Sequence, residues 1–168
     1  TLAASAIAGQ ATLTSVTPNN VVAGATPGNV EYVFAPATQL VFTSTDADNF
    51  AFTHSAARYA ADSAVTCTVA ITSGTGTAGT VACTASASGT VNTCLLSATS
   101  DFVAADVVTV TCTSNIAANG AAGDVTTAMV TTTDTTAATA ATTTITAAKT
   151  CADADGAGVG AAAVTCNA

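Results

Sequence analysis

Val65-Thr66-Cys67-Thr68-Val69-Ala70-Ile71 is the stretch of sequence that decides the fold. Valine, cysteine and isoleucine fill every second position, whereas threonine and alanine fill the positions between them. Successive side chains of an extended strand point to opposite faces, so this stretch would bury one face and expose the other. The alternation therefore predicts a half-buried β-strand.

The same alternation recurs along the chain. It is present upstream in Val30-Glu31-Tyr32-Val33-Phe34, and downstream it places Cys83, Cys94 and Cys112 on inward faces. The 36 threonines and 18 valines favour strand, and only the 42 alanines favour helix. Strands are expected near residues 10–17, 29–35, 38–44, 49–54, 64–72, 79–87, 90–97, 106–114, 124–132, 141–148 and 160–166.

Turn signals rich in glycine, asparagine and proline separate these runs, as at Ser88-Gly89. Many short strands with tight turns predict an all-β fold, a disulfide-bridged sandwich of two antiparallel sheets in an immunoglobulin-like or jelly-roll arrangement. Residues 18–168 are expected to form this single domain, preceded by an extended N-terminal segment, residues 1–17. One helical turn is expected at Ala56–Ala61.

The six cysteines predict three disulfides, because structural zinc requires ligands in close pairs and this chain has no CxxC motif. Disulfides persist in oxidising compartments, so we expect a secreted protein, extracellular or on the cell surface. Ala, Thr and Val provide little bulk for a core, and bridges of about 2 to 4 kcal/mol each would offset this deficit.

Two hairpin registers are possible for the pairing of Cys67, Cys83, Cys94 and Cys112. A turn centred on Thr75 would place Cys67 opposite Cys83 and leave Cys94 for Cys112. A turn at Ser88-Gly89 would instead place Cys83 opposite Cys94 and leave Cys67 for Cys112. In either scheme Cys151 and Cys166 remain, and we expect them to bond to each other.

The net charge of −8, with only Arg58 and Lys149 as cations, opposes contact with phosphate-rich partners. Nucleic-acid binding needs basic groups that neutralise phosphates, and anionic lipid surfaces attract the same groups. No run of 18 or more strongly apolar residues is present. We therefore expect no nucleic-acid partner and no membrane insertion.

No catalytic constellation is evident. His54 is the only histidine, and no G-x-S-x-G motif accompanies it, so a Ser-His-Asp hydrolase is not indicated. The protein is expected to be non-enzymatic and to require no cofactor.

Two acidic loops are candidate calcium sites, because closely spaced carboxylates suit a hard cation. Asp153 and Asp155 precede a glycine, and Asp46 and Asp48 precede an asparagine. An EF-hand loop also needs a glutamate at its twelfth position, and no glutamate follows Glu31. Solvated turn carboxylates are the alternative interpretation.

The triplets Thr66-Cys67-Thr68 and Thr111-Cys112-Thr113 resemble the T-C-T motif of insect threonine- and cysteine-rich antifreeze solenoids, which bind ice. A solenoid needs a fixed repeat, and successive cysteines here lie at irregular intervals. Ice binding remains an alternative, because a flat threonine-rich face of a sandwich could also bind ice.

Only 7% of the residues are charged, against about 25% in ordinary soluble domains. Such a surface offers little mutual repulsion and favours association between copies. The segment from Leu2 to Val16 contains no charge, so it could add as a strand to the sheet of another subunit. Its expected interface residues are Leu2, Ala4, Ala6, Ile7, Leu13 and Val16. The alternative is that this segment pairs within its own domain.

This N-terminal strand candidate, followed by Val30-Glu31-Tyr32-Val33-Phe34 and Thr66-Cys67-Thr68-Val69, resembles the immunoglobulin-like subunits of extracellular fibres, pili and surface appendages. In these proteins an N-terminal strand of one subunit fills a groove in the next. The resemblance implies a structural filament subunit whose partners are copies of itself. Six cysteines depart from the chaperone-assembled bacterial pattern. The alternative is a secreted monomeric binding module or adhesin that recognises a glycan or cell surface, calcium or ice.

Overall fold

The computed structural model describes residues 9–43, 47–97 and 99–149 of the chain. These residues form strands and loops, with no helix among them and therefore none that could cross a membrane. The strands are β1 (Thr12–Pro18), β2 (Val30–Ala35), β3 (Leu40–Val41), β4 (Asn49–His54), β5 (Ala64–Val65), β6 (Cys67–Ser73), β7 (Val81–Ala85), β8 (Val91–Leu96), β9 (Asp101–Phe102), β10 (Val107–Cys112), β11 (Gly123–Thr131) and β12 (Ala141–Ile145).

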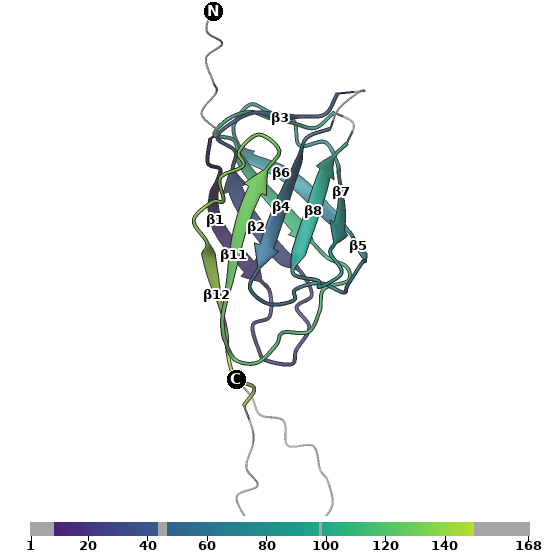
Figure 1. Cartoon of the computed structure of the whole chain (residues 1–168), viewed down its shortest axis with the longest axis vertical. Helices are drawn as coiled ribbons and strands as arrows, with labels where there is room; N and C mark the ends of the chain where they lie inside the picture. The colour runs from purple at the N-terminus through teal and green to yellow at the C-terminus, as the bar shows by residue number, and fades with distance from the viewer. Residues whose placement is uncertain (1–8, 44–46, 98, 150–168) are drawn as a thin grey trace, which may run out of the picture.

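Two antiparallel sheets form the two layers of the fold (Figure 1). The four-stranded sheet has the order β1-β2-β10-β6, and the six-stranded sheet has the order β12-β11-β4-β8-β7-β5. The short strands β3 and β9 pair separately at one end. The all-β prediction and the antiparallel sheets are thus confirmed.

The core lies between the two sheets and is built from the alternating positions that the sequence marks as apolar. Tyr32 and Phe34 of β2 face Phe50 and Phe52 of β4, and all four side chains are fully buried. The rings of Tyr32 and Phe52 stack with their centroids 4.0 Å apart. Aromatic pairs of this kind contribute about 0.5–1.5 kcal/mol beyond their buried area. The few bulky residues of the chain are therefore concentrated at one place.

The expected strand at residues 64–72 is interrupted at Thr66. β5 pairs with β7 in the six-stranded sheet, whereas β6 pairs with β10 in the four-stranded sheet. The chain changes sheets between them, and the Thr66 amide donates to Ser114 Oγ at this crossing. The alternation of the stretch is preserved, because Val65 is buried and the odd-numbered residues after it also face the core.

The helical turn predicted at Ala56–Ala61 is wrong. Tyr59 instead forms a β-bridge with Ile116, and the amides of Arg58 and Tyr59 both donate to the Gly89 carbonyl. These long-range bonds override the local helix preference of alanine. The short strand β9 was not predicted, and the strand expected at residues 160–166 lies outside the described residues.

The N-terminal strand belongs to the domain that follows it. β1 pairs antiparallel with β2, so a boundary after residue 17 falls inside an integrated strand. Leu13 and Val16, expected at a subunit interface, are buried in the chain's own core. Their assignment is corrected accordingly, because strand pairing with β2 directs both side chains between the sheets. Leu2, Ala4, Ala6 and Ile7 lie outside the described residues.

Candidate functional site

Each of the two main sheets contains one disulfide, which links two neighbouring strands. Cys67 of β6 bonds to Cys112 of β10, and Cys83 of β7 bonds to Cys94 of β8. This is the second of the two registers considered from sequence, with the turn at Ser88-Gly89 placing Cys83 opposite Cys94. The bridges indicate an oxidising compartment. Cys151 and Cys166 lie outside the described residues.

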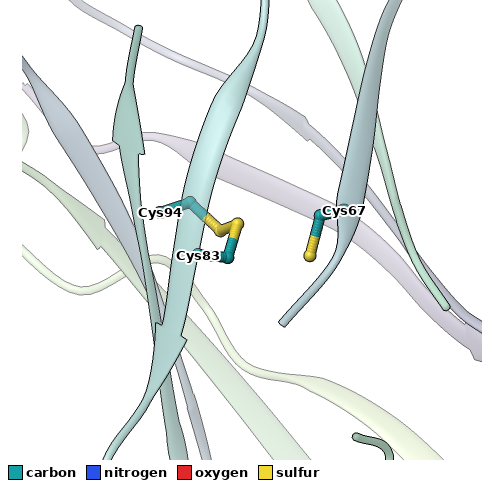
Figure 2. Close-up of side chains that lie close together, drawn as sticks. All are labelled: Cys67, Cys83 and Cys94. Carbon is teal, nitrogen blue, oxygen red and sulfur yellow. A yellow bond between two sulfur atoms is a disulfide. The ribbon is translucent and has the colours of Figure 1, made fainter. Parts of the chain in front are cut away.

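The two bridges approach each other in the interior, although they belong to different sheets. Figure 2 shows the Cys67 side chain between its own strand and the Cys83–Cys94 bond, and the three sulfur atoms lie within 4.8 Å of one another. The Nδ2 atom of Asn92 lies 3.7 Å from Cys112 Sγ and 3.8 Å from Cys94 Sγ. In the described part of the chain, these three sulfurs form the only cluster with metal-ligand spacing. Since all three are oxidised to disulfides, they lack the thiolate that binds a metal.

Of the four candidate calcium ligands, only Asp48 lies among the described residues. Asp48 Oδ2 accepts a hydrogen bond of 2.8 Å from the Val41 amide, so this carboxylate helps to fix the adjacent loop. Asp46, Asp153 and Asp155 lie outside the described residues. Calcium binding at either loop therefore stays a prediction.

His54 is at the centre of a buried polar cluster rather than in an open site. Its Nδ1 atom lies 2.8 Å from Thr127 Oγ1, and its Nε2 atom lies 3.2 Å from the Tyr32 hydroxyl. The Tyr32 hydroxyl lies 2.6 Å from that of Tyr59. Side-chain hydrogen bonds within the core thus satisfy both ring nitrogens of the histidine.

Burial keeps this cluster uncharged. Desolvation by burial, together with the smaller effect of the nearby Arg58 guanidinium, lowers the pKa of His54 from 6.5 to about 3. Desolvation also raises the pKa of Tyr59 to about 12 and raises that of Tyr32 well above its usual value. A histidine that is neutral and enclosed in this way is suited to a structural role.

The four outermost strands of the two sheets differ in how far they are covered. β1 lies beside β12, and Thr143 Oγ1 donates to the Val16 carbonyl across this side, 3.0 Å away. β5, at the opposite edge of the six-stranded sheet, contains only two residues. β6 has seven residues, and in the described chain it pairs only with β10.

The free side of β6 carries backbone groups that pair with no other described strand. The Cα atoms of Cys67 and Cys112 are 4.0 Å apart, a spacing typical of a non-hydrogen-bonded pair in an antiparallel ladder. Because such pairs alternate with hydrogen-bonded ones, the N–H and C=O groups of Cys67, Val69 and Ile71 point away from β10. This edge therefore presents a row of donors and acceptors that another strand could use.

The side chains of β6 are also incompletely covered. Val69 and Ile71 face the core yet are only half-buried, whereas Val108 and Val110 of the neighbouring β10 are fully buried. The strand contains neither a charged residue nor proline, which usually protect exposed edges. A register shift near Ser73 leaves the regular part of the strand at residues 67–71.

The outer faces of both main sheets are almost uncharged. Glu31 of β2 is the only charged residue in the strands of the four-stranded sheet, and Asp124 of β11 is the only aspartate or glutamate in those of the six-stranded sheet. The remaining outward positions are chiefly threonine, alanine and valine, as in Thr53, Thr84 and Thr93. The low charge of the composition is thus also a property of the folded surface.

A small cavity of about 260 Å³ lies beside the polar cluster, between the segment that follows β4 and the loop before β11. Arg58 lines this cavity and is 3% exposed. In the sequence Arg58 is simply one of two cations, and no local pattern indicates that it is buried. The sequence also shows no sign of the unprotected edge of β6, because whether a strand lies at an edge depends on which strands pair in the folded protein.

Comparison with known proteins adds no relative: no protein family, curated protein or solved structure shows a significant match to this chain.

Proposed function

We propose that this protein is a non-enzymatic structural subunit of an extracellular filament, in which copies associate by β-strand addition at the free edge of β6. The observation that carries the proposal is the combination of unpaired backbone groups and half-buried Val69 and Ile71 along that edge. An added strand would complete the ladder and cover both side chains. The disulfides and the nearly uncharged surface are consistent with this role.

The two-layered arrangement supports a finer assignment to the immunoglobulin-like or jelly-roll sandwiches. Strands distant in sequence are neighbours in each sheet, as β2 is next to β10 and β4 is next to β8. Such crossovers between sheets are common to both arrangements.

The donor in this proposal is the stretch of residues 2–8, which precedes β1. Residues 12–16 are excluded as donor because β1 is already paired with β2. Residues 2–8 contain no charge, and seven extended residues span about 23 Å, the length of β6. The described chain begins at one end of the long axis and leaves at the other (Figure 1), so a donor at one end favours head-to-tail growth.

The test is a pair of complementary variants. Val69→Lys puts a charge on the inward face of the acceptor edge, and the double change Leu2→Asp with Ile7→Asp disables the donor. Each variant alone should remain monomeric at concentrations where the unmodified protein polymerises, as followed by sedimentation and electron microscopy. An equimolar mixture should form dimers and no longer species, because each variant retains the half that the other lacks.

Thr84→Lys is the matched control, since it adds the same charge at an exposed outward position of β7. It should polymerise like the unmodified protein. The proposal is wrong if the unmodified protein stays monomeric at every concentration, or if Val69→Lys polymerises normally. A monomer that binds a glycan, calcium or ice would then be the better interpretation.

A further inference from the structure

The two disulfides belong to different sheets, yet their sulfur atoms are neighbours. Cys67 lies in the four-stranded sheet, whereas Cys83 and Cys94 lie in the six-stranded sheet. The three Sγ atoms are nevertheless within 4.8 Å of one another (Figure 2). Thiol–disulfide exchange begins when a thiolate attacks one sulfur of a disulfide, so it requires proximity of this kind. A thiolate formed in one bridge is therefore already beside the other bridge.

Asn92 connects the fourth sulfur atom to the same cluster. Its Nδ2 atom lies 3.9 Å from Cys67 Sγ, 3.8 Å from Cys94 Sγ and 3.7 Å from Cys112 Sγ, so one amide group contacts both bridges. Asn92 is fully buried. A negative charge in the interior needs a hydrogen-bond donor, and this amide can donate to a thiolate. It therefore provides a polar partner for a sulfur that is displaced from either bridge.

Cys67 is the cysteine of this cluster that lies nearest to solvent. It is half-buried, whereas Cys83, Cys94 and Cys112 are buried. It also begins β6, which in the described chain pairs only with β10. Access controls which sulfur of a protein reacts with a thiol. The burial of the four residues thus favours Cys67 as the first to be attacked.

We propose that a small thiol catalyses an exchange between the two bridges in the folded protein, so that part of the population carries the pairs Cys67–Cys83 and Cys94–Cys112. Cys94 and Cys112 are matched because both sulfurs contact the same Asn92 nitrogen. Cys67 and Cys83 then remain, within 4.8 Å. Both new bonds join the two sheets, whereas each present bond lies within one sheet. This exchange goes beyond the proposed filament function and does not depend on it.

The exchange has three steps and regenerates the thiol. The thiolate of the small molecule attacks Cys67 Sγ, forms a mixed disulfide there and displaces the Cys112 thiolate. The Cys112 thiolate attacks Cys94 Sγ and displaces the Cys83 thiolate. The Cys83 thiolate attacks Cys67 Sγ and releases the small thiolate unchanged. Two disulfides are present before and after, so no sulfur is oxidised or reduced overall.

The first test treats the unmodified full chain with a catalytic amount of 2-mercaptoethanol under native conditions without oxygen. N-ethylmaleimide stops the reaction, and non-reducing peptide mapping identifies the bonds. The pairs Cys67–Cys83 and Cys94–Cys112 should appear at a rate proportional to the thiol concentration. The same treatment in urea is the control, because an unfolded chain should also form bonds from these cysteines to Cys151 and Cys166. The proposal is overturned if the folded protein keeps only its present pairs, or if new pairs arise only together with such bonds.

Two single variants test the Cys67–Cys83 bond without an added thiol. Cys112→Ser leaves Cys67 as a free thiol beside the Cys83–Cys94 bond, so exchange should move part of the free thiol to Cys94. Cys94→Ser leaves Cys83 free beside the Cys67–Cys112 bond, so exchange should move part of the free thiol to Cys112. Maleimide labelling and peptide mapping locate the thiol, and circular dichroism verifies the fold. A label that stays on Cys67 in the first folded variant and on Cys83 in the second overturns the proposal. If a variant does not fold, the test on the unmodified chain decides.

Discussion

β1 and β6 are the two edge strands of the four-stranded sheet, and they are stabilised in different ways. β1 lies beside β12, and its inward residues Leu13 and Val16 are buried. β6 pairs with no strand other than β10 in the described part of the chain, and its inward residues Val69 and Ile71 are only half-buried. A disulfide to β10 provides the additional link at that edge.

The difference shows that an edge can be held by packing or by a covalent bond. Packing excludes other strands because it covers the edge, as at β1. A disulfide within the sheet fixes the strand and leaves its outer backbone groups accessible, as at β6. An edge that is both rigid and open is suited to receiving a strand from another molecule.

The largest expected effect comes from removing the covalent link at β6. The Cys67–Cys112 bond closes a separation of 45 residues, and its loss in Cys67→Ala with Cys112→Ala should lower the free energy of unfolding by about 4 kcal/mol in the chain-entropy model. Removing Cys83–Cys94, with a separation of 11, should lower it by about 3 kcal/mol. Urea unfolding without reductant measures both. The idea that the disulfide holds β6 in place would be contradicted if removing Cys67–Cys112 lowered the free energy of unfolding much less than removing Cys83–Cys94 does.

The next effect distinguishes packing at the two edges. Leu13→Ala should lower the free energy of unfolding by about 2 to 4 kcal/mol, because it leaves a cavity under a covered strand. Val69→Ala should lower it by only about 1 kcal/mol, since that side chain is half-exposed. Thr14→Ala, at an exposed position of β1, is the control and should change little. Equal losses at Leu13 and Val69 would remove the distinction between the edges.

The pKa of His54 reports whether water reaches the interior past the edge of β6. The pKa of His54 is about 3 in the fold and 6.5 when exposed, so its stabilising contribution is complete above pH 6.5 and is lost as the pH falls toward 3. Unfolding free energies should therefore drop by about 2 kcal/mol between pH 7.5 and pH 5. The drop should disappear in His54→Gln, because this is the only histidine in the chain. A normal pKa for His54, measured by NMR titration, would show that water enters past β6.

The smallest effect concerns the hydrogen bond that closes the β1 side. Thr143→Val keeps the shape of the side chain but removes the donor to the Val16 carbonyl, so it should lower the free energy of unfolding by about 1 kcal/mol. Thr142→Val, at an exposed position of the same strand, should have almost no effect. If the two variants are equally stable, β1 is held by its apolar contacts alone.

Local pattern was sufficient to predict several features of this fold. The alternation in the stretch from Val65 to Ile71 correctly assigned the residues that face the core, even where the chain changes sheets at Thr66. Tyr32 and Phe34 were likewise placed on one inward face and are fully buried. These successes follow from geometry, because each residue of a strand points opposite to its neighbour whatever the strand pairs with.

The disulfide pairing shows where local pattern was insufficient. Two hairpin registers agreed equally well with the sequence, and they differed only in which strands were neighbours. β6 and β7 lie in different sheets, so Cys67 cannot oppose Cys83 in a ladder. The turn that pairs Cys83 with Cys94 contains Gly89 at a φ of +66°, and a Cβ there would lie 2.1 Å from the Tyr59 carbonyl oxygen. Only glycine fits this close approach.

The sequence by itself determined which side chains face inward, that strands rather than helices would form, and that the surface would carry few charges. Each of these depends on the residue type or on its immediate neighbours. Only the tertiary structure decided that β1 is covered, that β6 pairs on one side only, and that Arg58 is buried with two donors that have no partner among the described residues. These features arise from contacts between residues far apart in the chain, and the local sequence does not specify such contacts.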